Sequence, residues 1–414
     1  MILFESICNV LLLIGFALLL IFSRYKLKIS FLAPSLFYGL FWFFISLLSV
    51  LNSGVFPIHP LTISYVMSSF LLMLFAHIVL NKFSSKSQRK YSFRLHKMFI
   101  ITGLISGFFA VITMMFAHGF GLSDLFSPSK IILLSNDAYS SKVKGEFSTP
   151  LLYLFLISIF YSSCVFAGIQ YSNNKESNRI AFLPFIVGVV IMLVETSKAP
   201  FLYATILWLG GYFSAKVFDD TKELFSKKFI KLVKRLFITI FLLFIISSIN
   251  RYNLLDGSNI NIFSILLMKF QVYFFGGLSS FNDWFLNVYT FNSSDLGFGK
   301  YTFGIFDKER GVFSDITKFE NNYSTNIYTY FRHLIVDFGV IGSLVFHFFI
   351  GFVLSLLYRL VQSGWEIFIP LLAISYTFTM WSFIISILIY KTILAAICLS
   401  IFLMYLTKIN FKNE

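Results

Sequence analysis

Apolar blocks of about 20 residues alternate with short polar connections along most of the chain. A block of this length spans the hydrocarbon core of a bilayer when it forms an α-helix. The blocks lack the apolar–polar alternation over about ten residues that is typical of transmembrane β-strands. The pattern therefore predicts an all-α integral membrane protein.

About eleven transmembrane helices are expected from these blocks. The first block has Glu5 rather than basic residues near its start, and no small-residue cleavage site follows it, so we interpret it as a retained helix rather than a signal peptide. The boundary between the last two blocks rests only on Tyr390 and Lys391. The expected helices cover residues 2–22, 31–51, 61–80, 98–117, 150–170, 180–195, 200–216, 236–250, 333–357, 367–387 and 390–407.

Lysine and arginine gather in the loops after the first, third, fifth, seventh, ninth and last of these helices. Positively charged loops remain in the cytoplasm, so we expect the amino terminus outside and the carboxyl terminus in the cytoplasm. The expected organisation is membrane helices in residues 1–250, with a smaller external loop at 118–149. A long external loop follows over 251–332, and residues 333–414 form the last membrane helices.

Composition agrees with a membrane protein. The chain has 57% hydrophobic and 13% charged residues, whereas a soluble domain carries roughly 25% charged residues. The net charge of +14 raises the question of a nucleic-acid partner. Cytoplasmic loops account for the distribution of basic residues better, so no nucleic acid is expected. No metal-binding or Walker motif is present, so we expect no metal, no cofactor and no ATP hydrolysis.

Two glycine patterns have structural interpretations. The stretch Ile262–Tyr289 in the long external loop is rich in aromatic residues and interrupted by Gly276 and Gly277. It is expected to form amphipathic helices on the membrane surface or a re-entrant segment. Gly103 and Gly107 match the GxxxG pattern of close helix packing, for which we favour contacts within one chain over dimerisation.

The start of the ninth predicted helix is the first candidate site. Tyr330, His333 and Asp337 follow at i, i+3 and i+7 and share one helix face. His333 and Asp337 are four residues apart, so their side chains can form a hydrogen bond, and a carboxylate that orients a histidine prepares a base. Arg332 projects about 100° around the helix, where we expect it to stack over Tyr328.

A structural interpretation of the same residues stays open. Tyrosine, arginine and histidine are common at the level of the lipid head groups, and Asp337 would then only pair with Arg332 or with Lys198. We favour the functional interpretation because Asp337 lies several residues inside the predicted span, where charge is costly.

Other basic residues are candidates for binding an anionic substrate. Lys198 lies in a very short outer turn and can bind a lipid-linked phosphate, or else simply pair with Glu195 at the membrane surface. Arg251 follows the eighth predicted helix. Lys300 lies in the glycine-flanked aromatic turn from Gly297 to Phe303, and Arg310 lies in a charged cluster that follows this turn. A folded loop with a solvated charge cluster explains Lys300 and Arg310 equally well.

The order of several motifs resembles the Wzy-type O-antigen and capsule repeat-unit polymerases, and the likeness covers most of the chain. In that family a basic residue, usually arginine, occupies the short outer turn in which Lys198 lies here. Lysine cannot make the bidentate contact that arginine makes. The motifs that carry the resemblance are Tyr273-Phe-Phe-Gly276-Gly277, Gly299-Lys-Tyr-Thr-Phe303, Thr325-Asn326-Ile-Tyr328, Arg332, Asp337-Phe-Gly339 and Gly342.

The resemblance implies a metal-independent glycosyltransferase with a GT-C-like architecture in the bacterial inner membrane. Such an enzyme joins oligosaccharide repeat units carried on undecaprenyl diphosphate at the outer face of the membrane. Arg332, Arg251 and Lys198 are expected to hold the departing diphosphate, and Asp337 or His333 is expected to act as the base. The resemblance also implies membrane lipids, a chain-length regulator protein and a flippase as partners.

Three alternatives remain. An O-antigen ligase uses the same lipid-linked donor with a different acceptor. A lipid-linked oligosaccharide flippase or another transporter would show charges in the middle of its spans and short loops on both sides, whereas here charge collects at outer helix ends and in one long loop. A membrane scaffold without activity would tolerate the loss of Arg332.

Overall fold

Most of the chain is helical in the computed structural model, and seven of the described helices are long and apolar enough to cross a membrane. They are α1 (Ile2–Tyr25), α2 (Pro34–Leu51), α3 (Pro60–Val79), α4 (Phe93–Ala117), α6 (Leu151–Ser172), α8 (Ala199–Phe218) and α11 (Tyr330–Gln362). The predicted class of membrane protein is therefore confirmed. The structure describes residues 2–80, 93–127, 130, 149–172, 179–195, 197–219, 227–252, 262–289, 296–303, 313, 315–319 and 323–410.

The remaining elements are shorter or more polar. Each expected apolar block contains a helix, although the number of helices that cross the membrane stays a prediction. The other helices are α7 (Leu183–Glu195), α9 (Lys227–Tyr252), α10 (Ile262–Asp283), α12 (Ile369–Trp381) and α13 (Lys391–Asn410). Short helical turns are η2 (Leu122–Phe126), η3 (Ile180–Phe182), η4 (Trp284–Val288), η6 (Glu366–Phe368) and η7 (Ile387–Ile389), and the strands β1 (Thr317–Lys318) and β2 (Ser324–Thr325) pair antiparallel.

Proline marks the first turn of three membrane helices, α2, α3 and α8. The first turn of a helix has no partner for its backbone N–H groups, so the missing N–H of proline costs nothing there. At α3 the residue before the proline also caps the helix, because Nδ1 of His59 accepts a hydrogen bond from the Leu61 N–H at 3.2 Å. Local sequence thus sets where these helices begin.

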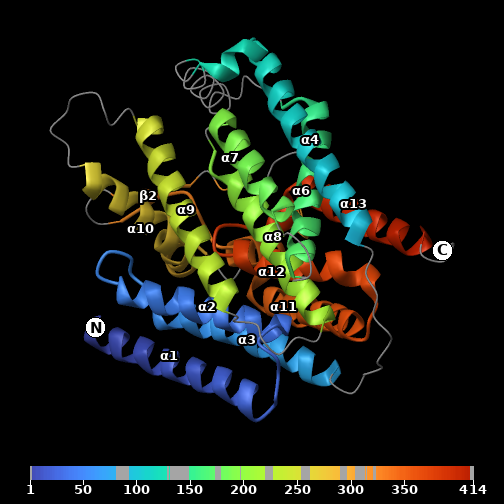
Figure 1. The fold of residues 1–414 in the computed structure, drawn as a ribbon. Coiled ribbons are helices and arrows are strands. Elements are labelled where there is room, and N and C mark those ends of the chain that lie inside the picture. Colours follow the sequence, from blue (N-terminus) through green and yellow to red (C-terminus); the bar gives the residue numbers. More distant parts are fainter. Residues whose placement is uncertain are drawn as a thin grey trace. The chain divides into compact units, whose positions relative to one another are not determined.

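The chain forms two compact units, of which unit 1 comprises residues 1–87, 267–363 and 375–391. In this unit α1, α2 and α3 lie side by side, and α11 packs against α2 and α3 (Figure 1). The rings of Phe16 and Phe70 stack with centroids 5.4 Å apart between these helices. Trp42 is also fully buried. Aromatic side chains therefore fill the centre of unit 1.

Unit 2 comprises residues 88–266, 364–374 and 392–414. Its helices α4, α6 and α8 pack closely because glycine lets their backbones approach. A Cβ on Gly168 would overlap the carbonyl of Trp208, and one on Gly103 would overlap the side chain of Ser163. Gly107 faces Phe160 in the same way. The GxxxG glycines therefore pack against α6 of the same chain, which confirms the preferred interpretation.

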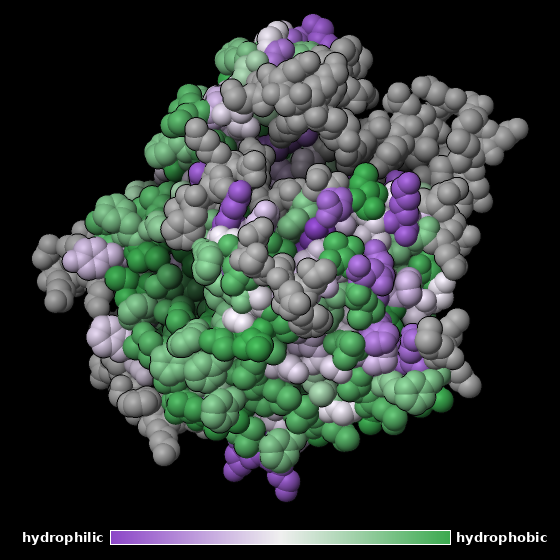
Figure 2. Space-filling view, turned by 180° about the vertical axis from the view of Figure 1, so that it is seen from behind, coloured by the Kyte–Doolittle hydropathy of each residue, from purple (hydrophilic) through white to green (hydrophobic). Residues whose placement is uncertain are grey.

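Hydrophobic side chains cover much of the surface. Figure 2 shows a face on which they form broad areas and hydrophilic side chains form smaller patches. Exposed apolar residues on the membrane helices include Leu11, Leu18, Phe108 and Phe155, each more than half exposed. Broad exposed apolar areas are typical of a surface that contacts a membrane or another protein.

Helix α10 is continuous through Gly276 and Gly277, and whether it lies on the membrane surface or forms a re-entrant segment stays a prediction. The glycines serve close packing: a Cβ on Gly277 would lie 2.6 Å from the Phe383 carbonyl oxygen. The end of α10 is fixed to the start of α3, because Oδ1 of Asn282 accepts hydrogen bonds from the His59 N–H and the Thr62 hydroxyl at 2.8 and 2.7 Å. The first part of the long loop is therefore built into unit 1.

Candidate functional site

Helix α11 consists of two halves joined at Gly339, where the backbone has φ 70° and ψ 175°. The Tyr330 hydroxyl lies 2.5 Å from Nε2 of His347, although these residues are 17 apart in sequence. A straight helix would separate their backbones by about 25 Å, which is more than two side chains can bridge. The short half (residues 330–338) therefore folds back against the long half (residues 340–362).

This break corrects the expected uninterrupted span over residues 333–357. The dihedral angles at Gly339 are open almost only to glycine. Arg332, His333 and Asp337 consequently lie on the short half and not on the part of α11 that continues as a long apolar helix. All three side chains are buried, at 4%, 1% and 0% exposure.

The aromatic turn of residues 296–303 is attached to the end of the short half. The backbone N–H groups of Gly297 and Phe298 donate to the carbonyls of Val336 and Asp337, both at 3.1 Å. The Asp337 carboxylate in turn accepts hydrogen bonds from the N–H groups of Tyr301 at 3.1 Å and Thr302 at 2.6 Å. Asp337 therefore anchors this turn, since buried N–H groups require acceptors.

The hydrogen bond from His333 to Asp337 proposed from sequence is not what positions the carboxylate. Both carboxylate oxygens of Asp337 face the backbone of the 296–303 turn. Nδ1 of His333 instead lies 3.4 Å from the carbonyl of Thr329, and the imidazole ring lies 5.0 Å from the ring of Phe313. The turn competes successfully for the carboxylate because it offers two N–H donors that have no other buried acceptor.

Aromatic rings surround the guanidinium of Arg332. Its Cζ lies 3.8 Å from the ring centroid of Phe313, 4.0 Å from that of Tyr328 and 5.0 Å from that of Trp284. The predicted stacking of Arg332 over Tyr328 is thus confirmed. Nη2 forms an ion pair with Asp315, whose side chain is 58% exposed. Nε and Nη1 are buried and have no hydrogen-bond partner among the residues that the structure describes.

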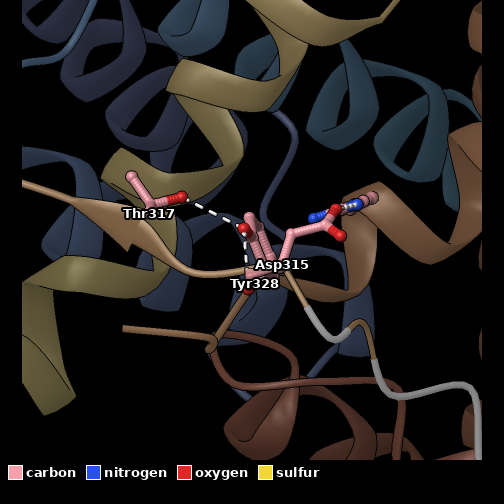
Figure 3. A network of polar contacts seen from close by, with 4 residues as sticks. Asp315, Thr317 and Tyr328 are labelled. Atoms are coloured by element: carbon pink, nitrogen blue, oxygen red, sulfur yellow. Dashed lines mark hydrogen bonds and ion pairs between the residues drawn. The ribbon is translucent and has the colours of Figure 1, made fainter. Parts of the chain in front are cut away.

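Tyr328 is held in place under the guanidinium by the segment that carries Asp315. The Tyr328 hydroxyl donates to the Asp315 carbonyl at 3.2 Å and lies 3.1 Å from the hydroxyl of Thr317, which is free to donate to it. Figure 3 shows this chain of contacts beside strand β1. The pairing of Thr317 with Thr325 across the two strands brings this segment to the start of the short half.

The segments behind the family resemblance pack together in unit 1. A Cβ on Gly276 would lie 3.3 Å from the Thr325 side chain. The 296–303 turn binds the end of the short half, as described above, and Arg332 contacts Tyr328. A groove of about 300 Å³, lined mainly by apolar side chains such as Phe298 and Phe346, runs from Asp337 along the long half.

The predicted binding residues divide among different parts of the structure. Lys300 lies in the 296–303 turn with Nζ 5.8 Å from the Tyr301 ring, in the same unit as Arg332. Lys198 belongs to unit 2, where its Nζ lies 3.4 Å from the ring of Phe244. Arg251 lies in the last turn of α9. Arg310 lies outside the described residues. Their assembly into one site with Arg332 stays a prediction.

Sequence reasoning missed the other groups that surround Arg332. Asp315, Phe313 and Trp284 lie well before it in the sequence, within the predicted long loop, so no helical or strand periodicity links them. The only available signal was compositional, because aromatic residues are frequent throughout the long loop.

Across the described ranges, no group of three or more histidine, cysteine, aspartate or glutamate side chains is arranged to hold a metal ion. No protein-family model, curated protein or solved structure matches the chain. The geometry of the site is therefore the basis for a functional proposal.

Proposed function

We propose that this protein is a polymerase that joins undecaprenyl-diphosphate-linked oligosaccharide repeat units into O-antigen or capsular polysaccharide. In the proposed reaction, the bond between the terminal sugar carbon and the lipid diphosphate breaks, and the diphosphate leaves with the electron pair. A hydroxyl oxygen of the next lipid-linked unit forms the new bond to that carbon, and its proton passes to a base on the enzyme.

The observation that carries this proposal is the environment of Arg332. A buried polar group without a partner is costly, and two nitrogens of this buried guanidinium have none within the described ranges. The exposed carboxylate of Asp315 compensates the charge only in part, because solvent screens it. An anion that accepts hydrogen bonds from Nε and Nη1 would complete the site, and a diphosphate has the charge and the oxygen geometry that arginine recognises best.

The contacts of Asp337 and His333 favour different roles for these two candidate bases. Asp337 has both carboxylate oxygens occupied by backbone N–H groups, which suits an anchor better than a base. His333 lies next to Arg332 on the short half, beside the ring of Phe313. We therefore assign the proton acceptor to His333. Metal-independent transfer follows from this assignment, since a cation already stands where charge develops on the leaving group.

Aromatic rings near Arg332 suit the faces of sugar rings. Tyr301 and Phe313 stack with centroids 5.3 Å apart, and Phe313 meets Tyr328 edge to face. We propose that this surface contacts the oligosaccharide, and that Lys300 and Arg310 are further substrate-binding residues. Lys198 and Arg251 are proposed as further cations for the lipid diphosphate.

The proposal includes the topology expected from the loops. About eleven spans with a GT-C-like arrangement, an outside amino terminus and a location in the bacterial inner membrane would place the 296–303 turn on the outer side. A flippase that delivers lipid-linked units and a chain-length regulator are the proposed protein partners.

The test is the surface polysaccharide of the host bacterium after deletion of the gene. We expect the ladder of long chains to collapse to single repeat units and to return with the wild-type gene. Unchanged long chains would contradict the proposal. Long chains that stay on the lipid carrier would indicate a ligase, and repeat units trapped on the cytoplasmic side would indicate a flippase.

A further inference from the structure

A chain of buried hydroxyl groups connects the short half of α11 to three other segments. The Tyr330 hydroxyl lies 2.5 Å from Nε2 of His347 on the long half and 2.6 Å from the Tyr38 hydroxyl on α2. The Tyr38 hydroxyl lies 2.9 Å from Oγ of Ser69 on α3. All four residues are 0% exposed. The proposed reaction uses none of them, so the chain requires another explanation.

The direction of these hydrogen bonds follows from the acceptor at one end. Nδ1 of His347 lies 2.6 Å from the Ser343 carbonyl, which can only accept, so Nδ1 carries the hydrogen. In a neutral imidazole Nε2 then accepts from Tyr330. Tyr330 has one hydrogen and must accept from Tyr38, whose remaining contact is the Ser69 hydroxyl. The Ser69 hydroxyl also donates to the Val66 carbonyl at 2.7 Å, so its single hydrogen is shared between this carbonyl and Tyr38. A charged imidazole would reverse these bonds and leave the Ser69 hydrogen to the Val66 carbonyl alone, but burying a charge costs more than sharing one hydrogen between two acceptors.

We propose that Tyr330, His347 and Tyr38 are positioning residues that hold Arg332 in its binding geometry. Rotation about the backbone of Gly339 would move the whole short half as a rigid body. The hydrogen bond between Tyr330 and His347 joins the two halves across this break. It fixes the end of the short half that lies farthest from Gly339. Arg332 follows Tyr330 by two residues, so the same bond fixes the backbone that carries the guanidinium. The role at the diphosphate rests on the proposed function.

The chain offers a matched control for this proposal. The Tyr65 hydroxyl of α3 lies 2.7 Å from Oγ of Ser343, and Tyr65 is 6% exposed. Replacing Tyr65 by phenylalanine therefore also removes one buried hydroxyl bonded to α11. This bond reaches only the long half and does not cross the break at Gly339.

The first experiment measures the position of the short half of α11 without reference to activity. In protein whose native cysteines are replaced by serine, spin labels on Asn326→Cys and Ile341→Cys flank the short half at two exposed positions. We expect one narrow distance distribution by pulsed electron resonance for this protein and for Tyr65→Phe. Tyr330→Phe and Tyr38→Phe should broaden it or add a second distance. A distribution unchanged in both of these variants would overturn the proposal.

The second experiment asks whether the hydrogen-bonded chain of Tyr330, His347 and Tyr38 acts through Arg332. The probe is undecaprenyl diphosphate, titrated into the full-length protein in detergent. We expect Tyr330→Phe to raise Kd about tenfold with Arg332 present and to have no further effect in Arg332→Ala. His347→Gln, which keeps an acceptor for Tyr330, should retain more affinity than His347→Leu. Equal losses with and without Arg332 would overturn the positioning role. Absence of binding to the wild-type protein would instead contradict the proposed function and overturn Arg332's diphosphate role, while the spin-label distances would still decide whether the chain fixes the short half.

Discussion

Gly297 packs directly against the carboxylate of Asp337, so closely that a Cβ at this position would overlap Oδ1. The same carboxylate accepts hydrogen bonds from the N–H groups of Tyr301 and Thr302. The turn can therefore close around the carboxylate only when residue 297 has no side chain. This contact joins two sequence motifs that lie about 40 residues apart, and it fixes the end of the short half of α11.

Replacing Gly297 by alanine tests this contact. We expect the free energy of unfolding to fall by about 1–3 kcal/mol, because the added methyl group forces the turn away from Asp337. Gly54→Ala is the matched control in the same unit, since a Cβ there meets no atom within 4 Å. Thermal unfolding in detergent measures both variants. Equal melting temperatures for the two would show that the 296–303 turn does not pack as described.

Asp337→Asn separates an anchoring carboxylate from a catalytic base. The amide would place a donor opposite one of the two N–H groups, so we expect a loss of about 1–3 kcal/mol of stability together with lost polymer. His333→Gln should abolish polymer formation while changing the melting temperature far less. If Asp337→Asn unfolded at the wild-type temperature and still formed no polymer, Asp337 rather than His333 would be the better candidate for the base.

Arg332→Lys keeps the charge but loses the planar group that stacks between Phe313 and Tyr328. We expect polymer length to fall nearly as far as in Arg332→Ala. Asp315→Asn is the comparison, because this exposed partner should contribute less than about 1 kcal/mol to stability and leave chains close to normal length. Gel analysis of the polysaccharide measures all three variants. Full activity in Arg332→Lys would contradict a role that depends on guanidinium geometry.

Labelling with a membrane-impermeant maleimide tests the orientation of the chain. In a background without native cysteines, Phe298→Cys in the 296–303 turn should react when the reagent is added outside the inner membrane. Lys26→Cys, in the exposed connection after α1, should react only after the membrane is permeabilised. The opposite pattern would reverse the topology and place the Arg332 site in the cytoplasm.

The helical membrane class was predictable because segment length and apolar content are set by the bilayer and are readable from sequence. The stacking of Arg332 over Tyr328 was also predicted, although α11 begins only at Tyr330 and the contacts of Tyr328 with Asp315 and Thr317, not helical spacing, hold its ring under the guanidinium. The break at Gly339 was not, because a single glycine inside a long apolar run is compatible with an unbroken helix until its dihedral angles are known.

Contacts between distant segments account for the rest. Asp315 reaches Arg332 only because the strand pair at Thr317 and Thr325 brings the preceding segment back to the short half. Asp337 binds the 296–303 turn for a similar reason, although helical spacing alone favoured His333 as its partner. Such pairings depend on how irregular segments fold, which no local periodicity encodes.

Polymerisation by the purified protein tests the central claim most directly. The wild-type protein and the Arg332→Ala variant would be reconstituted in vesicles with lipid-linked repeat units extracted from the deletion strain, in the presence of a metal chelator. We expect the wild-type protein to form chains of many repeat units and the variant to form almost none. Single repeat units alone with well-folded wild-type protein, or equal chains from both proteins, would contradict a polymerase whose site contains Arg332.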